Sequence, residues 1–233
     1  MTSEKSDPKP ARLIIDGPRD GAANMAADEA LFYAAANLPY AATLRLYSWN
    51  PPTLSLGRRQ KLEEVNAEKC RALGIDVVKR IGGGAAVYHG DEITYCFVSR
   101  NDLLPIPTGE QWHAAFSLFL EKLGLMPDAG KAKSRVSHDG NACFACAAED
   151  EPTVGGGKKF VGSARRKSKA VFLQHGSILL SPQPDFLCEL VTGAETDASI
   201  GLKTLLPSLT RETAHAALIA AIEETFSLRF PPA

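Results

Sequence analysis

The residue types best suited to nucleophilic chemistry fall in one irregular stretch between residues 138 and 159. It carries Cys143 and Cys146, and Lys158-Lys159 follow directly after Gly155-Gly156-Gly157. A thiol is weakly ionised at neutral pH and needs a nearby cation to become a thiolate nucleophile. A turn at the three glycines would fold Lys159 back toward the cysteines. We therefore predict covalent catalysis by a cysteine of this stretch, with Lys159 as its cation.

Plainer interpretations of the same residues stay open. The Cys143-x-x-Cys146 spacing could supply half of a zinc site or a redox pair, but no second CxxC or paired-histidine motif follows, and only His138 is close. Either cysteine could instead be a small buried apolar residue, and Lys158-Lys159 could be a solvated pair on a loop. We expect no metal site here.

A second glycine loop, Gly82-Gly83-Gly84, lies between Arg80 and His89. Three glycines add no side-chain packing and permit positive φ, so they suit a backbone that turns sharply or lies against a ligand. A dinucleotide fingerprint would need glycine at Val87, and a P-loop would need serine or threonine at Lys159. Neither nucleotide motif is present in its usual form, which leaves a ligand-binding loop or a plain glycine hairpin.

Composition indicates an ordinary globular protein. The chain has 233 residues, of which 45% are hydrophobic and 23% charged, enough for one sizeable core. We expect a disordered polar tail over residues 1–11 and a single domain over residues 12–233. A net charge of −1 gives no reason to expect nucleic acid or a membrane as partner. The absence of an apolar leader, of a membrane-length run and of disulfide spacing predicts a cytoplasmic protein with reduced thiols.

Hydrophobic periodicity predicts a mixed sheet with much antiparallel pairing, because short turns and not helices join most strands. Residues 93–98 alternate as a half-buried strand does, and residues 108–123 have the spacing of a core-facing helix. The expected strands are residues 12–16, 43–49, 53–56, 75–78, 85–89, 93–98 and 170–180. The expected helices are residues 22–36, 62–73, 108–123, 184–191 and 210–226.

Five segments, in order, resemble the lipoate protein ligase and octanoyltransferase family. They are NMAADEAL at residues 24–31, LRLYSW with PPTLSLG at residues 44–57, the Arg80 to Tyr95 loop, KFVGSA at residues 159–164 and QHGSIL at residues 174–179. Cys143-Phe144 ahead of KFVGSA resembles the cysteine-dependent, Bacillus-type octanoyltransferase branch. The Pro-Cys-Gly segment of the other transferase branch is absent.

This resemblance implies a biotin/lipoate protein ligase-like catalytic domain of α/β (α+β) type, with a mixed, largely antiparallel sheet flanked by helices. It implies transfer of an octanoyl group from acyl carrier protein to a lysine of a lipoyl domain of 2-oxoacid dehydrogenase complexes or of glycine cleavage H protein. A thioester on Cys143 would carry the group, and Lys159 would lower the pKa of that thiol. No cofactor would be required.

Two alternatives remain at this point: an ATP-dependent lipoate protein ligase, which alone would need ATP and Mg²⁺, and a non-catalytic lipoyl-domain binding module. Among the cysteines, Cys96 should be packed in a strand and Cys188 should lie in a helix, while Cys146 competes with Cys143. The expected substrate-binding residues are Arg80, Gly82, Gly83, Gly84, His89, Gly162, Ser163, Ala164, His175 and Gly176. The two histidines are expected to line or support the pocket and are given no proton-transfer role.

Overall fold

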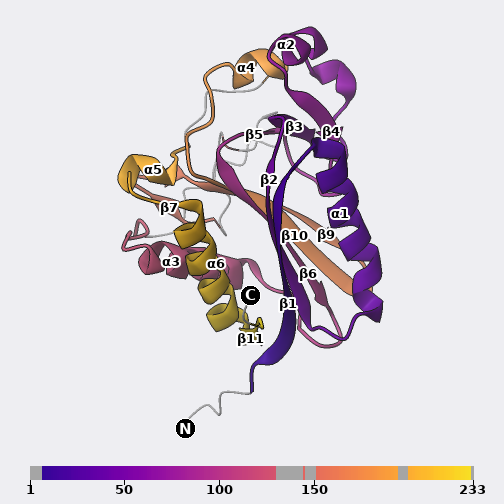
Figure 1. The fold of residues 1–233 in the computed structure, drawn as a ribbon, viewed down its shortest axis with the longest axis vertical. Coiled ribbons are helices and arrows are strands. Elements are labelled where there is room, and N and C mark those ends of the chain that lie inside the picture. The colour runs from indigo at the N-terminus through magenta and orange to yellow at the C-terminus, as the bar shows by residue number, and fades with distance from the viewer. Residues whose placement is uncertain (1–6, 130–143, 145–150, 194–198, 232–233) are drawn as a thin grey trace.

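The fold is built on a six-stranded mixed sheet with the order β11-β1-β2-β6-β10-β9 (Figure 1). The computed structural model describes residues 7–129, 144, 151–193 and 199–231. The first three strands of this order run parallel, and the pairs from β2 to β9 are antiparallel. The strands are β1 (Lys9–Arg19), β2 (Ala42–Trp49), β6 (Glu92–Arg100), β9 (Val161–Lys167), β10 (Val171–Leu179) and β11 (Leu228–Arg229).

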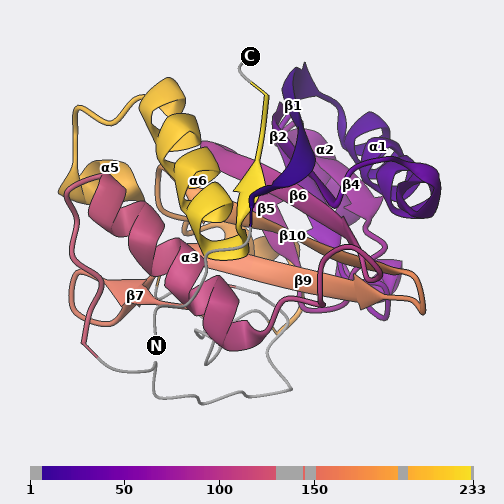
Figure 2. The same cartoon turned by 90° about the horizontal axis from the view of Figure 1, so that it is seen from below.

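Helices cover both faces of this sheet. Helix α1 (Gly21–Ala34) lies along one face, whereas α3 (Gly109–Lys122) and α6 (Arg211–Phe226) pack against each other on the opposite face (Figures 1 and 2). Each begins at a residue whose side chain accepts a backbone N–H of the first turn, namely Asp20, Thr108 and Thr210. The other helical segments are the 3₁₀ turns η1 (Ala35–Asn37) and η2 (Leu62–Glu64) and the short helices α2 (Ala67–Ala72), α4 (Leu187–Leu190) and α5 (Leu202–Leu205).

A smaller sheet, in the order β4-β3-β5, lies at one end of the main sheet (Figure 1). It consists of β3 (Thr53–Leu56), β4 (Asp76–Lys79) and β5 (Val87–His89). A hairpin of β7 (Thr153–Val154) and β8 (Lys158–Lys159) completes the strands, and its turn is Gly155-Gly156-Gly157, all with positive φ. The glycine turn predicted ahead of Lys159 is therefore present.

Strand β6 is buried on both of its faces, which corrects the expectation of a half-buried strand. Its residues from Glu92 to Ser99 are all buried. The alternating polar positions do not face solvent, because α1 covers the side on which Thr94 and Cys96 lie, while Tyr95 and Phe97 pack against α3 and α6. Alternation here separates an interior that is almost wholly apolar from one that mixes apolar and polar side chains.

The expected strands and helices are present, but β9, β11 and α5 were not expected, and three expected segments differ in their bounds. Residues 62–73 do not form one helix, because Val65 is extended, pairs with Val191 and separates η2 from α2. The segment expected as helix 184–191 is helical only over α4. Strand β1 begins at Lys9, so residues 9–11 belong to the sheet and not to a tail. None of the helices in the described ranges is long and apolar enough to cross a lipid bilayer.

Candidate active site

Sheet register brings residues of four strands, most of them polar, into two rows beneath α1. One row contains Arg45, Cys96, His175 and Ala164, which are successive partners across β2, β6, β10 and β9. The next contains Tyr47, Thr94, Ser177 and Gly162. Residues distant in sequence thus meet on one face of the sheet because antiparallel partners lie directly opposite each other.

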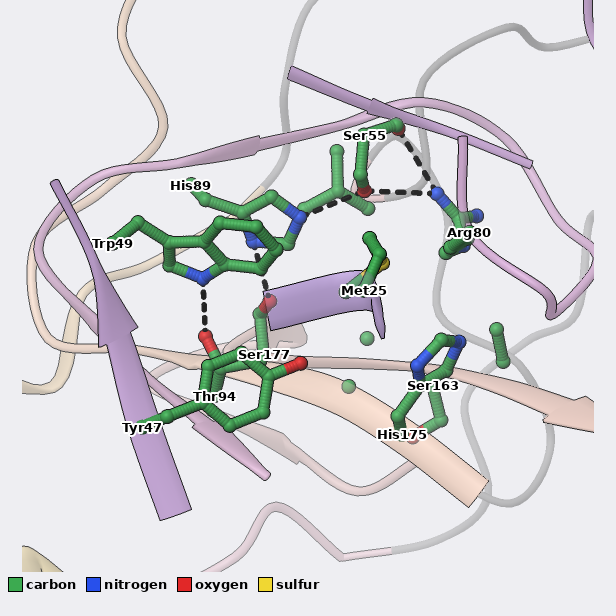
Figure 3. A pocket seen from close by; sticks show the side chains of 14 residues that line it. Met25, Tyr47, Trp49, Ser55, Arg80, His89, Thr94, Ser163, His175 and Ser177 are labelled. Atoms are coloured by element: carbon green, nitrogen blue, oxygen red, sulfur yellow. Dashed lines mark hydrogen bonds between the residues drawn. The ribbon is translucent and has the colours of Figure 1, made fainter. Parts of the chain in front are cut away.

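Between these rows, α1 and the small sheet lies a partly open pocket, with about 340 Å³ of empty space when the part open to solvent is counted (Figure 3). Its lining residues are Met25, Tyr47, Trp49, Ser55, Arg80, Val87, His89, Thr94, Gly162, Ser163, Ala164, His175, Gly176 and Ser177. Seven of the residues expected to bind substrate are therefore brought together here: Arg80, His89, Gly162, Ser163, Ala164, His175 and Gly176.

A buried ionic cluster under α1 holds one side of the pocket. Arg45 donates to Asp28 Oδ1 at 2.8 Å and to Asp16 Oδ2 at 2.7 Å. Asp28 Oδ2 accepts the hydroxyl of Tyr47 at 2.8 Å and Nδ1 of His175 at 3.1 Å. An ion-paired carboxylate can only accept hydrogen bonds, so Nδ1 of His175 carries a hydrogen and donates it to Asp28. The other ring nitrogen, Nε2, lies next to Gly82. Burial, and then the Asp28 charge, raise the pKa of Tyr47 well above its ordinary value.

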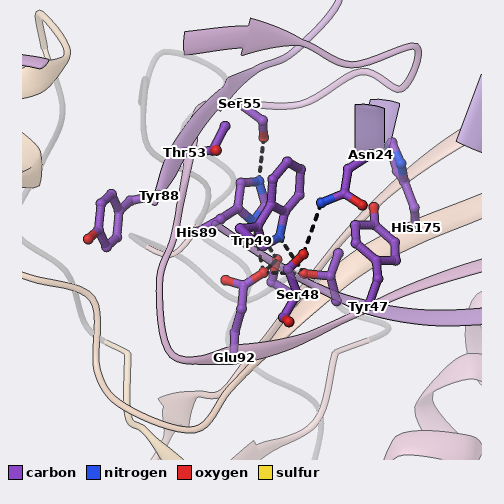
Figure 4. A network of polar contacts seen from close by, with 12 residues as sticks. Asn24, Tyr47, Ser48, Trp49, Thr53, Ser55, Tyr88, His89, Glu92 and His175 are labelled. Carbon is purple, nitrogen blue, oxygen red and sulfur yellow. Dashed lines mark hydrogen bonds and ion pairs between the residues drawn. The ribbon is translucent and has the colours of Figure 1, made fainter. Parts of the chain in front are cut away.

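A second buried network surrounds His89 (Figure 4). Its Nδ1 lies 2.8 Å from Glu92 Oε1, its Nε2 lies 2.7 Å from Ser55 Oγ, and its ring stacks on Trp49 with centroids 4.1 Å apart. Glu92 Oε1 also accepts from Ser177 at 2.7 Å. The imidazole is therefore held in one orientation against the pocket wall, which fits the supporting role expected for it.

Arg80 binds the glycine loop that follows it. Its guanidinium donates to the carbonyl oxygens of Gly83 and Ala85 at 2.8 and 2.6 Å, and to Ser55 Oγ at 3.1 Å. Among Gly82, Gly83 and Gly84, only Gly84 has a positive φ, of +88°, so only this position of the loop has a backbone that strongly favours glycine. Arg80 thus organises the loop as well as lining the pocket.

The loop glycines lie next to the pocket wall and are not among the lining residues. A Cβ at Gly82 would lie 2.6 Å from His175 Nε2, so this glycine allows the loop to rest on the imidazole ring. A Cβ at Gly83 would meet nothing within 4 Å. Close approach to the protein's own histidine therefore explains glycine at the first position, and the proposed approach to a ligand stays a prediction.

Strands β9 and β10 form a close-packed wall at Gly162, Ser163 and Gly176. A Cβ at Gly176 would lie 2.2 Å from the carbonyl oxygen of Gly162. Ser163 Oγ lies 2.8 Å from the Tyr95 hydroxyl, and Ser163 N donates to Glu151 Oε1 at 3.0 Å. Burial raises the pKa of Tyr95, so this hydroxyl stays neutral at physiological pH.

Lys159 is buried and ion-paired. Its Nζ lies 2.8 Å from Glu151 Oε2 and 5.3 Å from the ring centroid of Phe144. Phe144 in turn packs with Val87, a residue of the pocket lining. Glu151, whose other oxygen accepts from Ser163, therefore links Lys159 to the β9 wall. The sequence gave no role to this glutamate.

The cysteines differ in how far the structure describes them. Cys143, the predicted nucleophile, and its competitor Cys146 lie outside the described residues. Cys96 is fully buried, and burial raises its pKa well above the ordinary value, as expected for an inert thiol. Cys188 lies in α4 as expected, but it is exposed, so burial does not shield its thiol from an acyl donor.

Several pocket residues received no role from the sequence. Met25, Tyr47, Trp49, Ser55, Thr94 and Ser177 line the pocket, and Asn24, Asp28 and Arg45 support it from beneath. The available signal was the resemblance of residues 24–31 and 44–57 to family segments. Those segments could be recognised, but the register that brings them together could not.

Solved structures define the class of fold. A crystal structure of lipoate-protein ligase A bound with ATP superposes with a TM-score of 0.80 at 24% identity, covering 96% of this chain and 88% of that one. The bipartite lipoate protein ligase of Thermoplasma acidophilum, described with its E2 lipoyl domain, superposes with a TM-score of 0.76 at 19% identity over 96% of this chain and 86% of that one. The predicted lipoate ligase-like fold is confirmed.

Sequence comparison places the chain within this class. Residues 20–227 match the family model described as the lipoyl protein ligase A/B catalytic domain. A relative from Moorella thermoacetica named octanoyltransferase LipM is 39% identical over 76% of this chain and 67% of its own length. The chain belongs to the lipoyl protein ligase A/B catalytic domain family, and the resemblance recognised in its motifs is confirmed.

Proposed function

We propose that this protein is an octanoyltransferase of protein lipoylation that acts through a cysteine thioester. It moves an octanoyl group from acyl carrier protein to a lysine of a lipoyl domain or of glycine cleavage H protein. Its similarity to octanoyltransferase LipM supports the activity. The structural observation that supports the mechanism is the position of Lys159, whose ammonium lies 5.3 Å from the ring of Phe144, the residue after Cys143.

The first step is acylation of the enzyme. The thiolate of Cys143 attacks the thioester carbonyl of the donor, a new C–S bond forms, and the carrier thiol leaves and takes up a proton. The positive charge of Lys159 favours the thiolate form of Cys143. Glu151, 2.8 Å from the Lys159 ammonium, orients that charge. Backbone N–H groups near Gly82-Gly83-Gly84 stabilise the oxyanion.

The second step transfers the group to protein. The neutral amine of the acceptor lysine attacks the enzyme thioester, the C–N bond forms, the C–S bond breaks, and Cys143 is released. The proton lost by the amine passes to the departing thiolate. An amide is more stable than a thioester, so the two steps require no nucleotide. The octanoyl chain occupies the pocket beneath α1, between Met25, Trp49 and Val87.

Donor choice tests the proposal against its main alternative. Purified protein is mixed with an acceptor lipoyl domain and either octanoyl carrier protein alone or octanoate with ATP and Mg²⁺. We expect octanoylated acceptor, detected by mass spectrometry, with the carrier donor alone. Product formed only from the free acid with ATP would establish the ligase alternative. An inert protein that still binds the octanoyl carrier would indicate the non-catalytic module.

A further inference from the structure

Four exposed cations gather on the two loops that meet at the glycine loop. Arg58, Arg59 and Lys61 lie on the turn after β3, and Lys79 ends β4 immediately before Arg80. Lys61 and Lys79 line one shallow surface hollow, together with Leu62 and Glu63. We call Arg58, Arg59, Lys61 and Lys79 the basic lip.

Backbone contacts attach the basic lip to the glycine loop. Arg58 N donates to the carbonyl oxygen of Gly82 at 2.9 Å. A Cβ at Gly57 would lie 1.9 Å from the carbonyl oxygen of Gly84, so the two loops touch backbone to backbone. Gly82 in turn rests on His175, which lines the pocket. Any protein that delivers a group past the glycine loop therefore approaches these cations.

None of the four lip residues forms an ion pair with another residue of the described ranges, whereas Lys69, Lys122 and Lys203 each pair with an acidic side chain. Other exposed cations such as Arg12 and Arg229 are equally without an ion pair there, so the lip is distinguished by its position beside the glycine loop. The protein as a whole has a net charge of −1, and the four lip cations outnumber Glu63, the acidic residue of the same hollow, so the lip carries a local excess of positive charge. Such an excess beside a pocket attracts an acidic partner and raises its association rate.

We infer that the basic lip is the docking surface for the acyl donor, an acidic carrier protein that presents its thioester on a flexible arm. This inference rests on the proposed octanoyl transfer and adds where the donor binds. The lip holds the carrier by charge while the arm passes the glycine loop to the pocket. Because these cations are exposed at the rim, they contribute mainly to the association rate and its salt dependence.

The test compares two donors on one charge-reversed enzyme. Arg58→Glu/Lys79→Glu and its parent are acylated with octanoyl carrier protein and with octanoyl pantetheine, a small neutral thioester. Roughly tenfold to hundredfold slower acylation is expected with the carrier, together with a weaker dependence on salt. The rate with octanoyl pantetheine should stay within about twofold of the parent, because the pocket and its nucleophile are unchanged.

Arg12→Glu/Arg229→Glu is the matched control, since both residues are exposed and the change in net charge is the same. It should be acylated by both donors at the parental rate. Equal rates with the carrier for the lip variant and this control would overturn the inference, as would a defect confined to the acceptor lipoyl domain. A parent that neither donor acylates would instead refute the proposed transfer itself, and the inference with it.

Discussion

The two faces of the main sheet use the same strands for different purposes. On the face covered by α3 and α6, β2 and β6 present Leu44, Tyr95 and Phe97 to a core formed almost wholly by apolar side chains. On the face covered by α1, the same strands present Arg45 and Thr94 to hydrogen-bonded networks that end at the pocket. Apolar burial on the first face stabilises the fold, and buried polar contacts on the second face position the residues of the pocket.

This division follows from what each kind of burial contributes. Apolar burial stabilises in proportion to area and has little directional preference. Buried polar groups contribute little net stability, but each has defined partners, and loss of one partner leaves the other unsatisfied. Polar substitutions on the α1 face should therefore destabilise the fold by leaving a hydrogen-bond or ion-pair partner unsatisfied. Substitutions on the α3/α6 face should destabilise it according to the volume of apolar side chain that is removed.

The largest expected effect is at Arg45, on the polar face. Arg45→Met leaves Asp28 buried without its cation, and we expect the free energy of unfolding to fall by about 3–5 kcal/mol. Adding Asp28→Asn should recover part of this loss, because the unpaired buried charge is then removed while a side-chain oxygen remains to accept from Tyr47 or His175. Urea unfolding of the single and double variants checks the prediction, with exposed Arg12→Ala as the control. A double variant less stable than Arg45→Met would contradict it.

On the apolar face, Phe116→Ala should cost a similar or slightly smaller amount, about 3–4 kcal/mol, through lost burial and the cavity left behind. Phe116 is almost fully buried, with ring centroids 5.6 Å from Trp112 and 5.8 Å from Tyr95. Below its lowered midpoint, the variant should keep the acylation rate of the parent, because the pocket lies on the other face. Acylation lost in fully folded Phe116→Ala would show that the faces are not separate in function.

Neighbouring loop glycines provide a smaller, more local test. Gly82→Ala places a Cβ 2.6 Å from His175 Nε2, so the loop or the ring must shift, at a cost of about 1–3 kcal/mol. Gly83→Ala meets nothing within 4 Å and should be neutral in stability. We expect slower acylation only for Gly82→Ala. If Gly83→Leu also blocks acylation while the fold is intact, the ligand itself approaches the loop backbone.

The loss of folding stability at alkaline pH can be compared for one buried tyrosine from each face, Tyr47 and Tyr95. Burial raises the pKa values of Tyr47 and Tyr95 above the ordinary value of 10.0. A raised pKa in the folded state favours the protonated form, so its stabilising effect is complete below about pH 10 and is lost as pH rises further. Each group should contribute up to about 1.4 kcal/mol per pH unit there. Urea unfolding between pH 8 and 11 should show a shallower loss for Tyr47→Phe and Tyr95→Phe, and an unchanged slope in both would contradict the shifts.

The sequence predicted the elements well wherever local signals agreed. Residues 53–56 form β3 as expected, and Thr108 caps α3 at the expected start of that helix. The family and its fold class were also predictable, because five motifs recur in order, and the comparisons confirm them. Cys143-Phe144 ahead of KFVGSA indicated the transferase branch, and the relatives named octanoyltransferase LipM agree with it. For the site, residue chemistry drew attention to Arg80, His89 and Lys159, and the structure places Arg80 and His89 in the pocket lining.

Features that depend on register could not be predicted in this way. Asp28, Arg45 and His175 come from three distant segments, and only the strand pairing shows that they share one cluster. The covering of β6 on both faces depends on where α1 packs, which the alternating pattern of that strand does not reveal. Likewise, Val65 interrupts the expected helix through a bridge to Val191, a contact distant in sequence.

The most direct test of the account is to identify the residue that carries the acyl group. The protein is mixed with octanoyl carrier protein in the absence of acceptor, the thioester is trapped, and its position is mapped by peptide mass spectrometry. We predict label on Cys143, its loss in Cys143→Ala, and slower labelling in Lys159→Ala. Cys146→Ala and Cys188→Ala should label normally. Label on Cys146 would contradict the assignment, and no labelled cysteine alongside ATP-dependent transfer would contradict the mechanism.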